Sequence, residues 1–175
     1  MKNKNIFMEK KEIPVYISPM EYELIFVPKM EPNLLLYSTM VYDMGLRASN
    51  LLNLTYGDLN FASAGYIRIP KNHDMNSRIT LSVGVQSMLL TGFVGKHSND
   101  EYLFAMETGR RWTVSMISKA YAGLSKDTGS LINESSLFYS WCRNNAEYTF
   151  GNGNRAKARN MVSSLMEKGS VMNVM

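Results

Sequence analysis

Apolar residues recur at helical spacing over most of the chain. The first such stretch is 18–27, where Ser18 can cap a helix and Pro19 suits its first turn. A second stretch, 33–45, ends at Gly45, a residue that commonly terminates helices. Further stretches with the helical period are 47–54, 84–94, 113–126, 136–150 and 154–169. The pattern therefore predicts a mainly helical protein.

The period changes between the third and fourth helices. Residues 65–70 and 77–83 alternate between apolar and polar, as strands do, and the polar residues 71–76 join them. Residues 101–106 are predicted to be a short extended piece, followed by a turn at 107–112. The predicted fold class is mainly α with a small antiparallel β-hairpin or sheet, because strands and helices do not alternate.

One domain accounts for this pattern. The chain has 175 residues, 45% of them hydrophobic, which is enough for a single core. Residues 1–16 are predicted to form an N-terminal arm and residues 17–175 the domain. No apolar run is long enough to span a bilayer, and the charged N-terminus does not fit a secretory signal. A cytoplasmic protein without membrane contact is expected.

The chain offers few residues for metal or cofactor chemistry. Cys142 is the only cysteine, so neither an internal disulfide nor a cysteine-based zinc site is expected. His73 and His97 are too few and too scattered to predict a metal site. We expect no cofactor.

The charge balance favours a polyanionic partner. The net charge is +4 and the pI is about 9.1. Residues 139–175 carry five Lys or Arg against two Glu, a net of +3. The second half of the chain is therefore the expected side for contact with a polyanion.

The segment 45–59 holds the most informative motif, GLRASNLLNLTYGDL. It resembles the first box of the tyrosine recombinases, roughly G-L-R-x-S-E-L-L-x-L-x-W-x-D-I, with Asn50 for the glutamate and Tyr56 for the tryptophan. In that family a hairpin with a lysine in its turn follows, and Lys71 lies there in this chain. The resemblance implies the fold of the recombinase catalytic domain and double-stranded DNA as the partner.

The resemblance also implies a set of site residues. In these enzymes a tyrosine attacks a DNA phosphate, arginines hold that phosphate, and a lysine or histidines move protons. Arg47, Lys71 and Arg143 match the cations. By spacing, the second box, H-x-x-R, falls on Ser140–Arg143, which keeps the arginine and has Ser140 for the histidine. A competing register on Ser135–Phe138 keeps neither.

The third box departs from the family further. Lys168 stands where a histidine is expected, the nucleophile would fall beyond Met175, and no tyrosine follows Tyr148. We therefore expect a pseudo-enzyme that binds DNA, acting as a transcriptional or accessory regulator on a mobile element such as a plasmid. The residues expected to contact DNA are Arg47, Lys71, Arg78, Arg110, Arg111, Arg143, Arg155, Arg159 and Lys168.

Two other functions fit the same residues. The chain could be an active recombinase that uses a displaced tyrosine, such as Tyr139 or Tyr148, or a tyrosine donated by another subunit. It could also be a protein–protein interaction module on the same fold. In that case the apolar C-terminal segment 170–175 would dock on a neighbouring copy and form a homo-oligomer.

Overall fold

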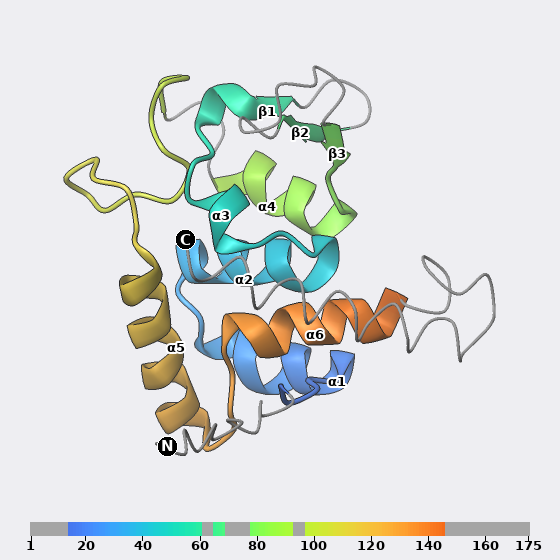
Figure 1. The fold of residues 1–175 in the computed structure, drawn as a ribbon. Helices are drawn as coiled ribbons and strands as arrows, with labels where there is room; N and C mark the ends of the chain where they lie inside the picture. The colour runs from blue at the N-terminus through green and yellow to red at the C-terminus, as the bar shows by residue number, and fades with distance from the viewer. Residues whose placement is uncertain (1–13, 61–64, 69–77, 93–96, 146–175) are drawn as a thin grey trace, which may run out of the picture.

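The computed structural model describes residues 14–60, 65–68, 78–92 and 97–145 (Figure 1). The helical segment near the N-terminus begins at Pro19, as predicted. The Ser18 hydroxyl accepts a hydrogen bond from the backbone N–H of Glu21 at 3.2 Å, which caps the helix. Its parts are α1 (Pro19–Glu21), a π-helical turn (Tyr22–Phe26) and a 3-10 turn (Val27–Lys29).

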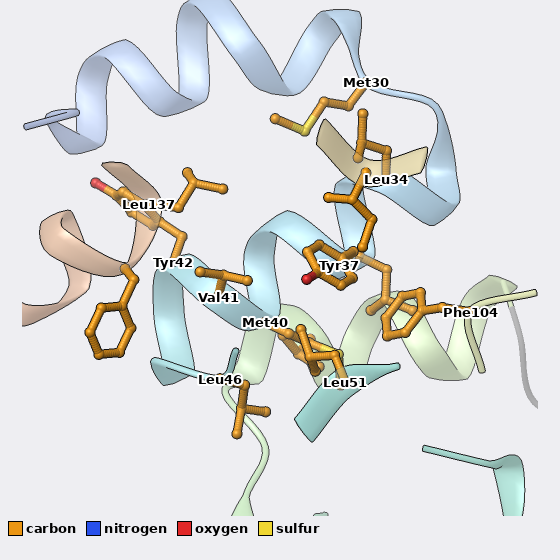
Figure 2. Packing of buried hydrophobic residues seen from close by; sticks show 14 of the residues in the cluster. Met30, Leu34, Tyr37, Met40, Val41, Tyr42, Leu46, Leu51, Phe104 and Leu137 are labelled. Carbon is orange, nitrogen blue, oxygen red and sulfur yellow. The ribbon is translucent and has the colours of Figure 1, made fainter. Parts of the chain in front are cut away.

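The second helix, α2 (Pro32–Met44), forms the centre of the fold. It packs against α6 on one side and α4 on the other (Figure 1). Eight of its residues are buried, from Leu34 to Tyr42, because neighbouring elements cover it on several faces. Figure 2 shows Tyr37, Met40 and Val41 of this helix within the hydrophobic core. The helix ends at Gly45, which has a φ of 67°, as the sequence predicts.

A short helix and a small sheet follow. The elements are α3 (Ala48–Leu51), a 3-10 turn (Tyr56–Asp58), β1 (Leu59–Asn60), β2 (Tyr66–Arg68) and β3 (Arg78–Thr80). The strands are antiparallel in the order β1-β2-β3, with Ile67 opposite both Leu59 and Ile79. The antiparallel pairing of β2 with β3 confirms the predicted hairpin. The sequence did not predict β1, because two residues are too few to show an alternating pattern. The predicted turn at 71–76 lies outside the described residues.

The remaining elements are helical. They are α4 (Val83–Gly92), α5 (Val114–Thr128) and α6 (Glu134–Asn145). Between α4 and α5, residues 101–112 extend and turn back: the N–H of Met106 donates to the carbonyl of Arg110 at 2.9 Å. This confirms the predicted turn. α6 starts two residues earlier than predicted, because the Asn133 side chain accepts from the N–H of Ser136 at 2.8 Å and caps it. The predicted helix at 154–169 lies outside the described residues.

Buried hydroxyl groups join the π-helical turn Tyr22–Phe26, α2 and α5. Tyr22 and Thr39 share a hydrogen bond of 3.0 Å, and Ser38 and Tyr121 share another of 3.0 Å. Each hydroxyl thus has a partner, which a buried polar group needs. The helices of the described ranges include none that is long and apolar enough to cross a bilayer. The mainly helical fold class with a small antiparallel sheet is confirmed.

Candidate functional site

Arg47 stands at the start of α3, where the sequence places it. Its backbone is extended, with φ −111° and ψ 163°. Its N–H donates to the Asn50 side chain at 3.3 Å, which caps the start of α3. Leu51, at the other end of α3, is fully buried and fixes the helix on the core. The position of Arg47 is therefore set by the fold on both sides.

The guanidinium of Arg47 forms an ion pair with Glu134, the first residue of α6. The distance from Arg47 Nε to Glu134 Oε1 is 2.9 Å. The same oxygen accepts from the backbone N–H of Ala48 at 3.1 Å, and Oε2 accepts from the Tyr37 hydroxyl at 2.9 Å. The side chains of Arg47 and Glu134 are 20% and 18% exposed. Three donors from α2, α3 and the residue before α3 thus hold one carboxylate.

The protonation of Tyr37 is fixed by this arrangement. Burial, and next the charge of the Glu134 carboxylate, raise the pKa of the Tyr37 phenol far above its ordinary value. Tyr37 therefore keeps its proton at all physiological pH values and donates a hydrogen bond to Glu134. The charges of Arg47 and Glu134 offset one another locally, so the pair presents little net charge to an external anion.

Aromatic rings complete the surroundings of Arg47. Its Cζ lies 4.6 Å from the centre of the Phe138 ring, a cation–π contact. Phe138 in turn stacks with Trp141 at 5.6 Å between ring centres. Glu134, Phe138 and Trp141 are spaced i, i+4 and i+7, so they share one face of α6. The face that meets Arg47 therefore carries one acid and two aromatic rings.

The residues of the spacing-based second box lie elsewhere on α6. Arg143 is exposed, and its Cζ lies 4.4 Å from the Tyr16 ring centre and 5.9 Å from that of Tyr139. It lies about 140° around the helix from Phe138, since each residue turns an α-helix by about 100°. Arg143 and Arg47 thus contact different groups: Arg143 lies beside Tyr16 and Tyr139, and Arg47 lies beside Glu134 and Phe138. The register on Ser135–Phe138, which the sequence left open, is the one whose last residue contacts Arg47.

Ser140 has a structural partner. Its Oγ accepts from the backbone N–H of Ile17 at 2.8 Å and donates to the carbonyl of Ser136 at 2.7 Å, and the residue is fully buried. Ser140 therefore fastens the segment before α1 to α6, as does Tyr16, whose hydroxyl donates to Asn144 at 2.8 Å. The end of the predicted arm is thus held against the domain.

Replacement of Ser140 by alanine is expected to lower the free energy of unfolding by about 1–3 kcal/mol, because the buried Ile17 N–H loses its acceptor. Urea denaturation followed by circular dichroism measures this. Ser136→Ala is the matched control: its Oγ is buried on the same helix and has no hydrogen-bond partner among the described residues. That change should leave stability unchanged or raise it. Equal losses in both variants would contradict the role given to Ser140.

The other described candidate cations are spread over the surface. Arg78 lies opposite Arg68 across β2 and β3, with its Cζ 4.7 Å from the Tyr66 ring centre. Arg111 donates to the Asn53 side chain just after α3, and Arg110 is exposed in the same turn. The candidates outside the described residues are Lys71, Arg155, Arg159 and Lys168, together with Tyr148.

Other reactive side chains are engaged or buried. Burial raises the pKa of the Cys142 thiol to about 11, so it is protonated at neutral pH. His97 stacks on Tyr56 at 4.3 Å between ring centres and pairs with Glu101 at 2.7 Å. The described residues include no group of His, Cys, Asp or Glu that could hold a metal ion.

Sequence reasoning missed Glu134 and Phe138. Glu134 is 87 residues from Arg47, and neither periodicity nor a motif links the two positions. The only sequence signal was the competing register, whose last residue is Phe138.

Comparison with solved structures identifies the fold. The chain is similar to XerA recombinase, with a TM-score of 0.64 and 16% identity, over 94% of this chain and 67% of that one. It is also similar to the integrase of transposon Tn1549, solved in complex with a circular-intermediate DNA. There the TM-score is 0.55 and the identity 16%, over 91% of this chain and 65% of that one. This chain thus spans about two thirds of each. Neither a family model nor a curated protein sequence matches it.

These likenesses confirm the tyrosine-recombinase-like fold that the GLR motif predicts. At 16% identity they show the fold alone. The chemistry of this chain therefore depends on its own residues.

Proposed function

We propose that this protein binds double-stranded DNA on a tyrosine-recombinase-like fold and does not transfer strands. Its role would be transcriptional or accessory regulation on a mobile element such as a plasmid, which rests on analogy with the fold. The pairing of Arg47 with Glu134 and Phe138 supports the loss of strand transfer, and the surface arginines without a carboxylate partner among the described residues support DNA binding.

The Arg47 contacts support the loss of strand transfer. Phosphoryl chemistry of this kind needs cations that hold the phosphate and stabilise the charge that develops on it. Here the Arg47 guanidinium already has the Glu134 carboxylate as its partner. In the register on Ser135–Phe138, Phe138 takes the position of the second arginine of the family, and its ring contacts Arg47. Arg143 lies on another side of α6. These contacts of the described residues support a loss of the charge stabilisation that the reaction needs.

The surface cations support DNA binding. Among the described residues, Arg78, Arg110, Arg111 and Arg143 form no ion pair with a carboxylate. Arg68 and Arg78 face each other across two strands, and like charges in that position repel unless an anion lies nearby. Phosphate groups suit such cations, and their contacts are independent of base sequence. One structural neighbour is an integrase solved with DNA bound.

Salt-dependent DNA binding is the expected result. Fluorescence anisotropy with a 30-base-pair duplex should give a log Kd that rises with log salt, because cation–phosphate contacts release counterions. Arg111→Ala should weaken binding by about threefold to tenfold and lower the slope by about one unit. Lys126→Ala on α5, outside the candidate set, is the control for net charge and should change affinity less. Absence of binding even at low salt would end the DNA proposal.

An active recombinase with a displaced tyrosine is the main alternative. Tyr139 is half-buried on α6 beside Arg143, which places a phenol near a cation. A nicked suicide substrate, which traps the covalent protein–DNA adduct, separates the two functions. We expect no adduct. An adduct that disappears in Tyr139→Phe would establish the alternative.

A protein–protein interaction module is the second alternative. Met20 and Leu24 are each 71% exposed and lie one helical turn apart on the first helical segment. A chain that fails to bind DNA but forms oligomers in analytical ultracentrifugation would fit this function.

A further inference from the structure

Glu134 is an anion of the chain itself that contacts Arg47. Its carboxylate takes one hydrogen bond from each of Arg47 Nε, the Ala48 N–H and the Tyr37 hydroxyl, at 2.9, 3.1 and 2.9 Å. A phosphodiester offers two unesterified oxygens that accept hydrogen bonds from the same kinds of donor. The groups around Glu134 are therefore as suited to a phosphate as to a carboxylate.

The pair is accessible and needs little movement to open. One fifth of the Arg47 side chain is exposed, and the ion pair uses Nε, only one of the several N–H donors of a guanidinium. Glu134 lies in the first turn of α6, so rotation of its side chain can withdraw the carboxylate while the helix backbone stays in place. A phosphate oxygen could then replace it as the acceptor for Tyr37.

We propose that Glu134 is an intramolecular competitor for DNA phosphate at Arg47. Binding of a phosphodiester there requires displacement of the Glu134 carboxylate. In the free protein the carboxylate therefore prevents Arg47 from binding phosphate. This inference rests on the proposed DNA-binding function, and it adds that Glu134 regulates phosphate binding at Arg47. The competing view is that the ion pair only stabilises the fold. That view predicts that loss of Glu134 changes stability and leaves DNA affinity unchanged.

Glu134→Gln tests the proposal by a gain of affinity. The amide keeps the size of the side chain and removes its charge. DNA affinity should rise by about tenfold, the effect of one charged hydrogen bond. The salt slope should also steepen by about 0.9, as one further phosphate is neutralised. Asp127→Asn, an exposed residue on α5, removes the same charge away from Arg47 and should change affinity by less than about twofold.

A double-mutant cycle locates the effect. Arg47→Ala should change DNA affinity by less than about twofold in the wild-type background, because the guanidinium is already paired. In the Glu134→Gln background it should remove the whole gain. A gain that survives Arg47→Ala, or a Glu134→Gln variant that behaves like Asp127→Asn, would overturn the proposal. Both outcomes leave DNA binding itself standing.

A second variant and a measurement without DNA also test the competition between Glu134 and phosphate. In Glu134→Ala the competing carboxylate is removed and all three donors are kept, so a gain in DNA affinity is expected even if Glu134→Gln does not fold. Titration with inorganic phosphate, followed by the NMR signal of Arg47 Nε–H, gives a readout without DNA. The signal should shift in Glu134→Gln and not in wild type. If no variant binds DNA, the proposed function fails, and an unchanged signal in Glu134→Gln would also reject the competition.

Discussion

Replacement of Gly45 by alanine is expected to lower the free energy of unfolding by about 3–5 kcal/mol. Gly45 has a φ of 67°, and a side chain in this left-handed conformation costs about 1–2 kcal/mol. The added Cβ would also lie 2.5 Å from Cδ2 of Trp141 and 2.6 Å from two further indole atoms. The indole is rigid and packs against Phe138, so relief of this overlap would disturb the face of α6 that meets Arg47.

Gly109→Ala is the matched control for Gly45→Ala. Gly109 has a similar φ of 77°, but no described atom lies within 4 Å of the position of its Cβ. Its replacement should therefore cost only the backbone strain, about 1–2 kcal/mol. Urea denaturation of both variants measures the difference, which reports the overlap with Trp141. Equal destabilisation would show that Trp141 moves aside freely.

Replacement of Leu51 by alanine is expected to lower the free energy of unfolding by about 2–5 kcal/mol. Leu51 is fully buried, and its loss leaves a cavity in addition to the lost transfer free energy. Figure 2 shows it near Met40 of α2 in the core. Leu51 is also the anchor of the four-residue helix α3, so the variant should loosen Arg47 at the other end.

Leu131→Ala is the control for Leu51→Ala. The Leu131 side chain is 54% exposed in the loop before α6, so its truncation should change stability by about 0.5 kcal/mol or less. Thermal and urea unfolding compare the two variants. A Leu51 variant as stable as the Leu131 variant would mean that α3 is not held by the core.

Most of the GLR motif encodes the fold. Gly45 ends α2, Leu51 and Leu54 are buried, and the Asp58 carboxylate accepts from both the N–H and the hydroxyl of Thr55 at 3.0 Å. These requirements are local in the chain, so a sequence pattern can carry them. This explains why the motif predicted the architecture although the overall identity to known structures is 16%.

The site was less predictable than the fold. The position of Arg47 followed from the motif, whereas its partner Glu134 did not. The assignment of Arg143 depended on a register of α6, and a shift of a few residues turns a side chain to another face of a helix. Periodicity could not choose between the registers, because Leu137, Ser140 and Cys142 are all buried. Only the packing of α6 against α2 and Gly45 fixes its rotation.

By itself the sequence determined the helices of the described residues, the ends at Ser18 and Gly45, the pairing of β2 with β3, and the place of Arg47 at the start of a short helix. These features depend on interactions within a few residues, such as capping and the spacing of apolar side chains. Only the tertiary structure decided which groups meet Arg47, because a charge interacts with whatever the fold brings near it, whatever the separation in sequence. The fold brings a carboxylate and a phenyl ring to Arg47, and places Arg143 on another side of the same helix.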